Sequence, residues 1–160
     1  MLNFFRKKKK LPADPANMQA VPMKSINYHP KVILAWAKAI EGNVELGKWL
    51  TENGYPELTV ACSAILLNNG ARDWLMQNGY PHLMAMIHAA EGNGQALHWL
   101  EVNDMEILYH IAQAVEDEQE AWEWLRINAT QDLFILAQSI KKVKDDIEFN
   151  HNDVHSFGID

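Results

Sequence analysis

Residues 74–81 read Trp74-Leu75-Met76-Gln77-Asn78-Gly79-Tyr80-Pro81. The core of this segment, a Trp-Leu pair followed by Asn three residues after the Leu, recurs every 25 residues along the chain. The repeated positions are Trp49, Trp74, Trp99 and Trp124, with Asn53, Asn78, Asn103 and Asn128. A fixed period of this kind is typical of repeat architectures, in which each unit packs against its neighbours.

Each period is predicted to contain two helices. In the first, the Trp-Leu pair and the asparagine share one helical face with an alanine in three of the four periods, as in Ala71, Trp74, Leu75 and Asn78 at i, i+3, i+4 and i+7. Gly79 ends this helix and Pro81 begins the next, because Gly adopts the left-handed conformation easily and Pro suits a first turn. The second helix repeats the spacing with apolar residues, for example Leu83, Met86, Ile87 and Ala90.

This pattern predicts an all-α fold. We expect a right-handed α-solenoid of about four 25-residue helix-turn-helix repeats, plus an N-terminal helix near residues 30–41. The repeat domain is predicted to span residues 30–143. Residues 1–29 form a basic leader and an irregular linker, and residues 144–160 form a polar tail that we expect to be loosely held or extended.

The segment from Ala39 to Gly54 resembles the core of an ankyrin repeat, and so does the segment from Ala89 to Leu100. In both, a Gly-containing turn joins two short helices, and the second helix carries a paired apolar motif. The period of 25 is shorter than the ankyrin period and leaves no room for a β-hairpin. The resemblance covers about residues 30–143 at the level of architecture, and it implies a protein-binding scaffold.

Three features of the repeat are interpreted as structural. The Trp column shares its face with Leu and Ala, so we expect it to be core rather than a row of binding sites. The Asn column is expected to satisfy backbone groups at helix ends. Cys62 lies on an apolar stripe, which predicts a buried, unreactive thiol. A single cysteine and the lack of a secretory signal favour a cytoplasmic location.

Charge is distributed unevenly along the chain. Arg6 to Lys10 hold five of the 14 basic residues, and the first ten residues hold no acid. The remainder therefore carries 9 basic and 21 acidic residues, a balance of −12. An acidic body argues against nucleic acid as a partner and fits a basic protein better. Weak contact with an anionic membrane is considered for the leader, through Phe4, Phe5, Arg6, Lys7, Lys8, Lys9 and Lys10.

The first functional hypothesis is a non-enzymatic interaction protein, an adaptor or assembly subunit. Its groove would follow the less apolar face of the second helices, through Val60, Ala85, His110, Ile135 and Ser63, His88, Gln113, Gln138. Acidic joints between helices and the unrepeated Trp122 add candidate contacts. The candidate partner-binding residues are His82, His88, Tyr109, His110, Gln113, Glu116, Asp117, Glu118, Glu120, Trp122 and Glu123.

Two alternatives stay open. The edge from Glu116 to Glu123 suits an acidic inhibitor, such as an immunity-type protein that blocks a basic toxin or nuclease. A metal-dependent enzyme would use His151, Asp153 and His155, whose imidazole and carboxylate groups suit divalent metals. No Gly-rich phosphate loop and no nucleophile motif occurs, so we predict neither enzymatic activity nor a cofactor.

Overall fold

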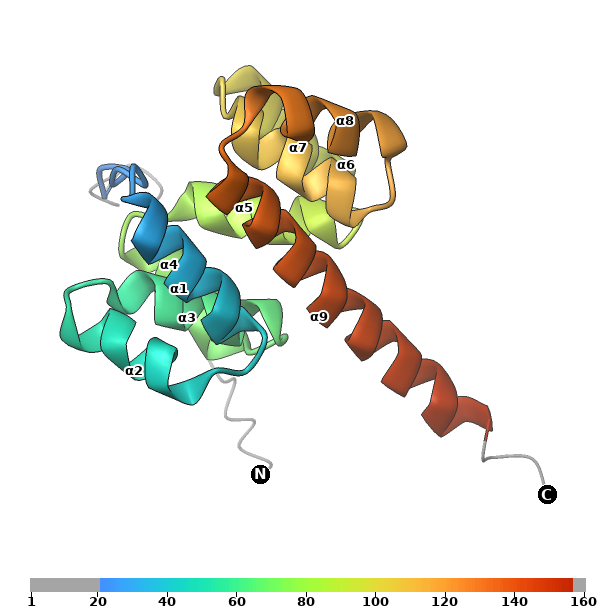
Figure 1. The fold of residues 1–160 in the computed structure, drawn as a ribbon, viewed down its shortest axis with the longest axis horizontal. Helices are drawn as coiled ribbons and strands as arrows, with labels where there is room; N and C mark the ends of the chain where they lie inside the picture. The colour runs from blue at the N-terminus through green and yellow to red at the C-terminus, as the bar shows by residue number, and fades with distance from the viewer. Residues whose placement is uncertain (1–20, 157–160) are drawn as a thin grey trace, which may run out of the picture.

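The protein folds into short α-helices joined by tight turns (Figure 1). The structure, a computed structural model, describes residues 21–156, with side chains through Asn152. Within that range the helices are α1 (Pro30–Ile40), α2 (Val44–Glu52), α3 (Pro56–Ile65), α4 (Asn69–Gln77), α5 (Pro81–Ala90), α6 (Gly94–Val102), α7 (Glu106–Val115), α8 (Gln119–Asn128) and α9 (Gln131–Ser156). The predicted all-α fold, with one initial helix and four helix pairs, is confirmed.

Local signals in the sequence place the helix ends. Asn43, Asn68 and Asn93 precede α2, α4 and α6, and each side-chain oxygen accepts a hydrogen bond from the N–H three residues later at 2.9 to 3.0 Å. Such an N-cap satisfies one free N–H of the first turn and contributes about 1 kcal/mol. Prolines occupy the first position of three helices, namely Pro30, Pro56 and Pro81.

The helices form two layers. α1, α3, α5, α7 and α9 make the inner layer, and α2, α4, α6 and α8 cover it from outside. Each outer helix buries one leucine completely: Leu50, Leu75, Leu100 and Leu125. The adjacent tryptophans do not form the predicted core, because Trp49 is 40% exposed and the other three are only partly buried. They lie along the layer boundary instead, as where Trp74 stacks on Tyr80 with ring centroids 6.2 Å apart.

The asparagine column has the predicted structural role. Asn53 donates a hydrogen bond from Nδ2 to the carbonyl oxygen of Trp49 at 2.8 Å. Asn78, Asn103 and Asn128 make the same bond to their own tryptophans at 2.8 to 3.0 Å. These carbonyls lie in the last turn of each outer helix. In α2, α4 and α6 each also accepts the backbone N–H of the same asparagine, so the side chain adds a second hydrogen bond at the helix end.

The two ends of the repeat array meet. α9 packs against α7 on one side and against α1 on the other, and the α1–α9 interface is the most extensive between any two described helices. Figure 1 shows the two helices running side by side. The inner helices therefore follow one another in a closed order, α1-α3-α5-α7-α9 and back to α1. Trp36 on α1 and Leu136 on α9 are both buried, with exposures of 2% and 1%.

The last helix also corrects the prediction for the C-terminal segment. α9 continues to Ser156, so the predicted polar tail is helical over most of its length rather than extended. Ion pairs one turn apart support the helix, with Lys141 Nζ 2.6 Å from Asp145 Oδ1 and Lys144 Nζ 3.8 Å from Glu148 Oε1. The final turns of α9 project beyond the rest of the molecule (Figure 1).

Candidate functional site

Three inner helices each end in a glutamate. We call the edge of the molecule formed by these helix ends the rim. Glu41, Glu91 and Glu116 are the C-caps of α1, α5 and α7. A carboxylate at this end meets the negative pole of the helix dipole, so it needs a compensating cation. A neighbouring element supplies one in each case, in the pairs Glu41–Lys142, Glu91–Arg72 and Glu116–Lys144.

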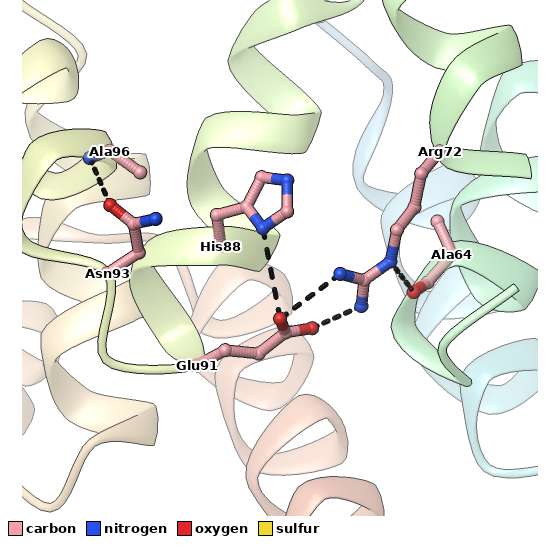
Figure 2. Close-up of polar contacts among 6 residues, drawn as sticks. All are labelled: Ala64, Arg72, His88, Glu91, Asn93 and Ala96. Carbon is pink, nitrogen blue, oxygen red and sulfur yellow. Dashed lines mark hydrogen bonds and ion pairs between the residues drawn. The ribbon is translucent and has the colours of Figure 1, made fainter. Parts of the chain in front are cut away.

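Arg72 shows how such a pair joins successive repeats (Figure 2). Its Nε donates to the carbonyl oxygen of Ala64 in the last turn of α3, at 3.0 Å. Its two terminal nitrogens donate to the two carboxylate oxygens of Glu91, and His88 Nδ1 lies 3.8 Å from the same carboxylate. The bidentate pair thus ties α3, α4 and α5 together. The Glu91 carboxylate is therefore already used in contacts within the fold.

An apolar pocket of about 150 Å³ opens at the rim. We call it the rim pocket. Its apolar lining comes from α3, α5, α7, α9 and the α3–α4 joint: Ile65, Leu67, Ile87, Ala90, Val115, Ile140 and Ile147. Three charged residues also line it, Glu91, Lys144 and Glu148, and each already belongs to an ion pair. A dry cavity of similar size in another protein accepts benzene, so the rim pocket can hold one apolar side chain.

The joint between α3 and α4 differs from the other joints. It carries Leu66 and Leu67, which are 57% and 55% exposed. The equivalent pairs at the other joints are Glu41-Gly42, Glu91-Gly92 and Glu116-Asp117. Leu67 adopts φ 68°, in the left-handed region. That conformation costs a non-glycine residue about 1–2 kcal/mol, and such strain is concentrated at functional sites.

Sequence reasoning missed this feature because it placed the joint too late in the chain. The sequence Asn68-Asn69-Gly70 reads as a turn, but Asn68 is the N-cap of α4 and Asn69 is already helical. The signal was nevertheless present, since Leu67 stands in the column of Gly42 and Gly92. A leucine in a glycine column marks a position where the repeat is broken.

The structure separates two of the predicted partner-binding histidines. His82 is only 1% exposed, its Nε2 lies 2.7 Å from the Lys24 carbonyl oxygen, and its ring stacks on Tyr80. Burial lowers the pKa of His82, although backbone carbonyl groups oppose this effect. His82 therefore cannot contact a protein partner directly. His88 is partly exposed at the rim, beside Glu91.

One part of the predicted groove, at His110, is occupied by an outer helix. His110 stacks on Trp124 of α8 with ring centroids 3.9 Å apart, and Tyr109 meets the same imidazole edge to face at 5.2 Å. Burial lowers the pKa of His110 as well. Gln113 is partly buried in a shallow depression between neighbouring repeats. Tyr109 and His110 therefore lie together as packing between α7 and α8, while Gln113 faces the neighbouring repeat.

The predicted acidic edge is partly neutralised by α9. Asp117 pairs with Lys141 at 2.8 Å, and Glu116 pairs with Lys144. Glu123 pairs with Arg126 of its own helix. Two exposed acids keep no ion pair with a described residue, namely Glu118 and Glu120. Trp122 is partly buried and meets Phe134 edge to face at 5.4 Å.

Some predicted residues lie outside what the structure describes. The side chains of Asp153 and His155 fall there, so the proposed ligand set with His151 has no described geometry. The described residues contain no group of three or more side chains able to hold a metal ion. The basic leader, from Phe4 to Lys10, also lies outside the described range.

A second concavity, of about 660 Å³, opens at the N-terminal ends of the inner helices. We call it the funnel. A strap made of residues 23–28 lines one side, and α1, α5, α7 and α9 contribute the remaining walls. The strap is held by the Lys24 N–H, which donates to the Gly79 carbonyl oxygen at 2.8 Å, and by the Tyr28 hydroxyl, which donates to Glu57 Oε1 at 2.8 Å.

Comparisons with protein-family models, curated proteins and solved structures gave no match for this chain. Among the helices that the structure describes, none combines the length and the apolar character needed to cross a membrane. The rim pocket and the funnel are therefore the features of this fold that bear on function.

Proposed function

We propose that the protein is a non-enzymatic interaction scaffold that takes an apolar side chain of another protein into the rim pocket. The observation that carries the proposal is the contrast between the pocket and its surroundings. Its walls are apolar, while the charged groups that line it are already paired with one another or with Arg72 and Glu116. Protein-binding hot spots are small desolvated pockets of this kind, surrounded by groups that exclude water.

The exposed leucines of the α3–α4 joint extend the apolar surface beyond the pocket itself. Leu66 adjoins the pocket-lining Leu67, and more than half of each side chain is exposed. A partner that covers both leucines and fills the pocket would remove this surface from water.

The test is affinity capture of the partner from a lysate of the source cells, followed by measurement of its Kd. Two pocket variants, Leu67→Gly and Ile147→Ser, should each weaken binding tenfold or more. Met76→Ser is the matched control, because Met76 is as exposed as Leu67 but does not line the pocket. Unchanged binding by both pocket variants, with folding verified by circular dichroism, would overturn the proposal.

The acidic inhibitor remains as a second candidate because Glu118 and Glu120 are exposed and have no ion pair with a described residue. If it is correct, Glu118→Lys and Glu120→Lys should slow association strongly at low salt. The pocket variants should then leave the affinity unchanged. The two candidates therefore predict opposite results from one set of variants.

A further inference from the structure

The funnel contains a carboxylate that forms no bond with the rest of the described fold. Asp132, at the start of α9, is only 8% exposed and lines the funnel. No hydrogen bond or ion pair joins its carboxylate to another described residue. The N-terminal end of α9 stabilises a carboxylate to a modest degree. The carboxylate oxygens are not enclosed by the protein, so a ligand in the funnel can reach them directly.

Several other polar groups of the funnel are already engaged, although Nδ1 of His82 is buried there without a hydrogen-bond partner. The Lys24 ammonium lies 5.5 Å from the centroid of the Tyr80 ring. The hydroxyl of Tyr28 donates to Glu57, and Nε2 of His82 contacts the backbone carbonyl of Lys24. Asp132 is thus the charged acceptor left open in the described part of the funnel.

The remaining walls set the shape and polarity of a ligand. Apolar side chains face the funnel from the strap, α1, α7 and α9: Ile26, Ile33, Ile107 and Leu133. A concavity of about 660 Å³ is within the range of roughly 300–1,000 Å³ that holds small molecules. Apolar walls around one carboxylate match a ligand that has a positive charge on an apolar body.

We propose that the funnel binds a small organic cation, an ammonium group on an apolar body, with Asp132 as its counter-ion. The ammonium donates hydrogen bonds to the Asp132 carboxylate, and the apolar body packs against the isoleucines and Leu133. The proposal goes beyond partner docking, because the funnel and the rim pocket lie at opposite ends of the inner helices.

The first test uses 2-phenylethylammonium as the probe, with binding to the full chain followed by titration calorimetry and by NMR. We expect saturable binding in the millimolar range or tighter. The uncharged analogue 2-phenylethanol and the anion 3-phenylpropanoate should each bind at least tenfold more weakly. Equal binding of the alcohol would overturn the assigned role of Asp132. Preference for the anion would show that the helix N-termini dominate the site, and no saturable binding by the ammonium would also overturn the proposal.

Variants locate the binding site. Asp132→Asn keeps the shape but removes the charge, so it should weaken ammonium binding at least tenfold. Asp146→Asn is the matched control, since Asp146 is an exposed acid on the same helix that does not line the funnel. If Asp132→Asn does not fold, Ile107→Phe provides a second route, because it fills the funnel and leaves Asp132 in place. Undiminished binding by both folded variants, or by Ile107→Phe alone where Asp132→Asn fails to fold, would overturn the proposal.

Discussion

Closure of the helix array makes Leu136 on α9 a sensitive position. Its side chain is 1% exposed, and α9 is held between α7 and α1. Leu136→Ala removes three buried carbon atoms from a site that has packed neighbours on both sides and little freedom to collapse. Core substitutions of this type cost about 2–5 kcal/mol, and we expect about 3 kcal/mol here.

Urea denaturation of the wild type and of Leu136→Ala measures this loss as a change in the unfolding free energy. Native-state hydrogen exchange then reports where the loss is felt. Because α1 packs directly on α9, the amides of α1 should lose protection together with those of α9. Phe149→Ala is the control on the same helix: Phe149 is 70% exposed, so its loss should change stability by less than about 0.5 kcal/mol.

A result in which α9 loses protection while α1 keeps it would refute the closed arrangement. In an open array α1 and α9 lie at opposite ends, and stability is roughly a sum of nearest-neighbour interfaces. Damage at one end can then leave the other end intact. The closed order forbids this, because α9 shares its largest interface with α1.

Three further predictions test local features. Asn78→Ala removes the hydrogen bond to the Trp74 carbonyl oxygen and should cost about 1 kcal/mol in urea denaturation. Burial lowers the pKa of His82 in the folded chain, so below the ordinary histidine pKa of about 6.5 the unfolded chain binds more protons. Stability should therefore fall as pH decreases from about 7.5 to 5.5, and His82→Gln should reduce that dependence. Burial raises the pKa of the Cys62 thiol to about 12, so iodoacetamide should modify the native protein at pH 8 at least about a hundredfold more slowly than the urea-unfolded chain.

The helix boundaries and the repeat were predictable because their causes are local. Pro30, Pro56 and Pro81 are each the first residue of a helix. Gly79 adopts φ 89° just past a helix end, as the sequence suggested. The hydrogen bond from Asn78 to Trp74 also joins residues within one turn. Signals of this range need no knowledge of the rest of the molecule.

The sequence did not predict how each outer helix is rotated about its own axis. Trp74 and Leu75 are adjacent and both apolar, so periodicity assigns them to the same broad face. A rotation of the helix about its axis by a small angle decides which of the two points into the inner layer. The packed structure buries Leu75 fully and leaves Trp74 at the layer boundary.

The candidate site depended even more on long-range structure. The rim pocket combines side chains from four helices and one joint, and its lining runs from Ile65 to Glu148. The acids predicted as a docking edge are partly neutralised because lysines of α9 reach them, and Asp117 pairs with Lys141 across the α7–α9 boundary. No pattern within a 25-residue frame contains these distances.

From the sequence alone one obtains the 25-residue unit, its two helices, its asparagine caps and positions that break the period, such as Trp122. The tertiary structure decides that the units close on themselves, so that α1 and α9 meet and their inner helices surround the rim pocket and the funnel. The physical reason is that each repeat specifies only its own contacts and those with its neighbours. The small rotation between units accumulates over the whole array. Whether the first and last helices come into contact is therefore decided only in the assembled fold.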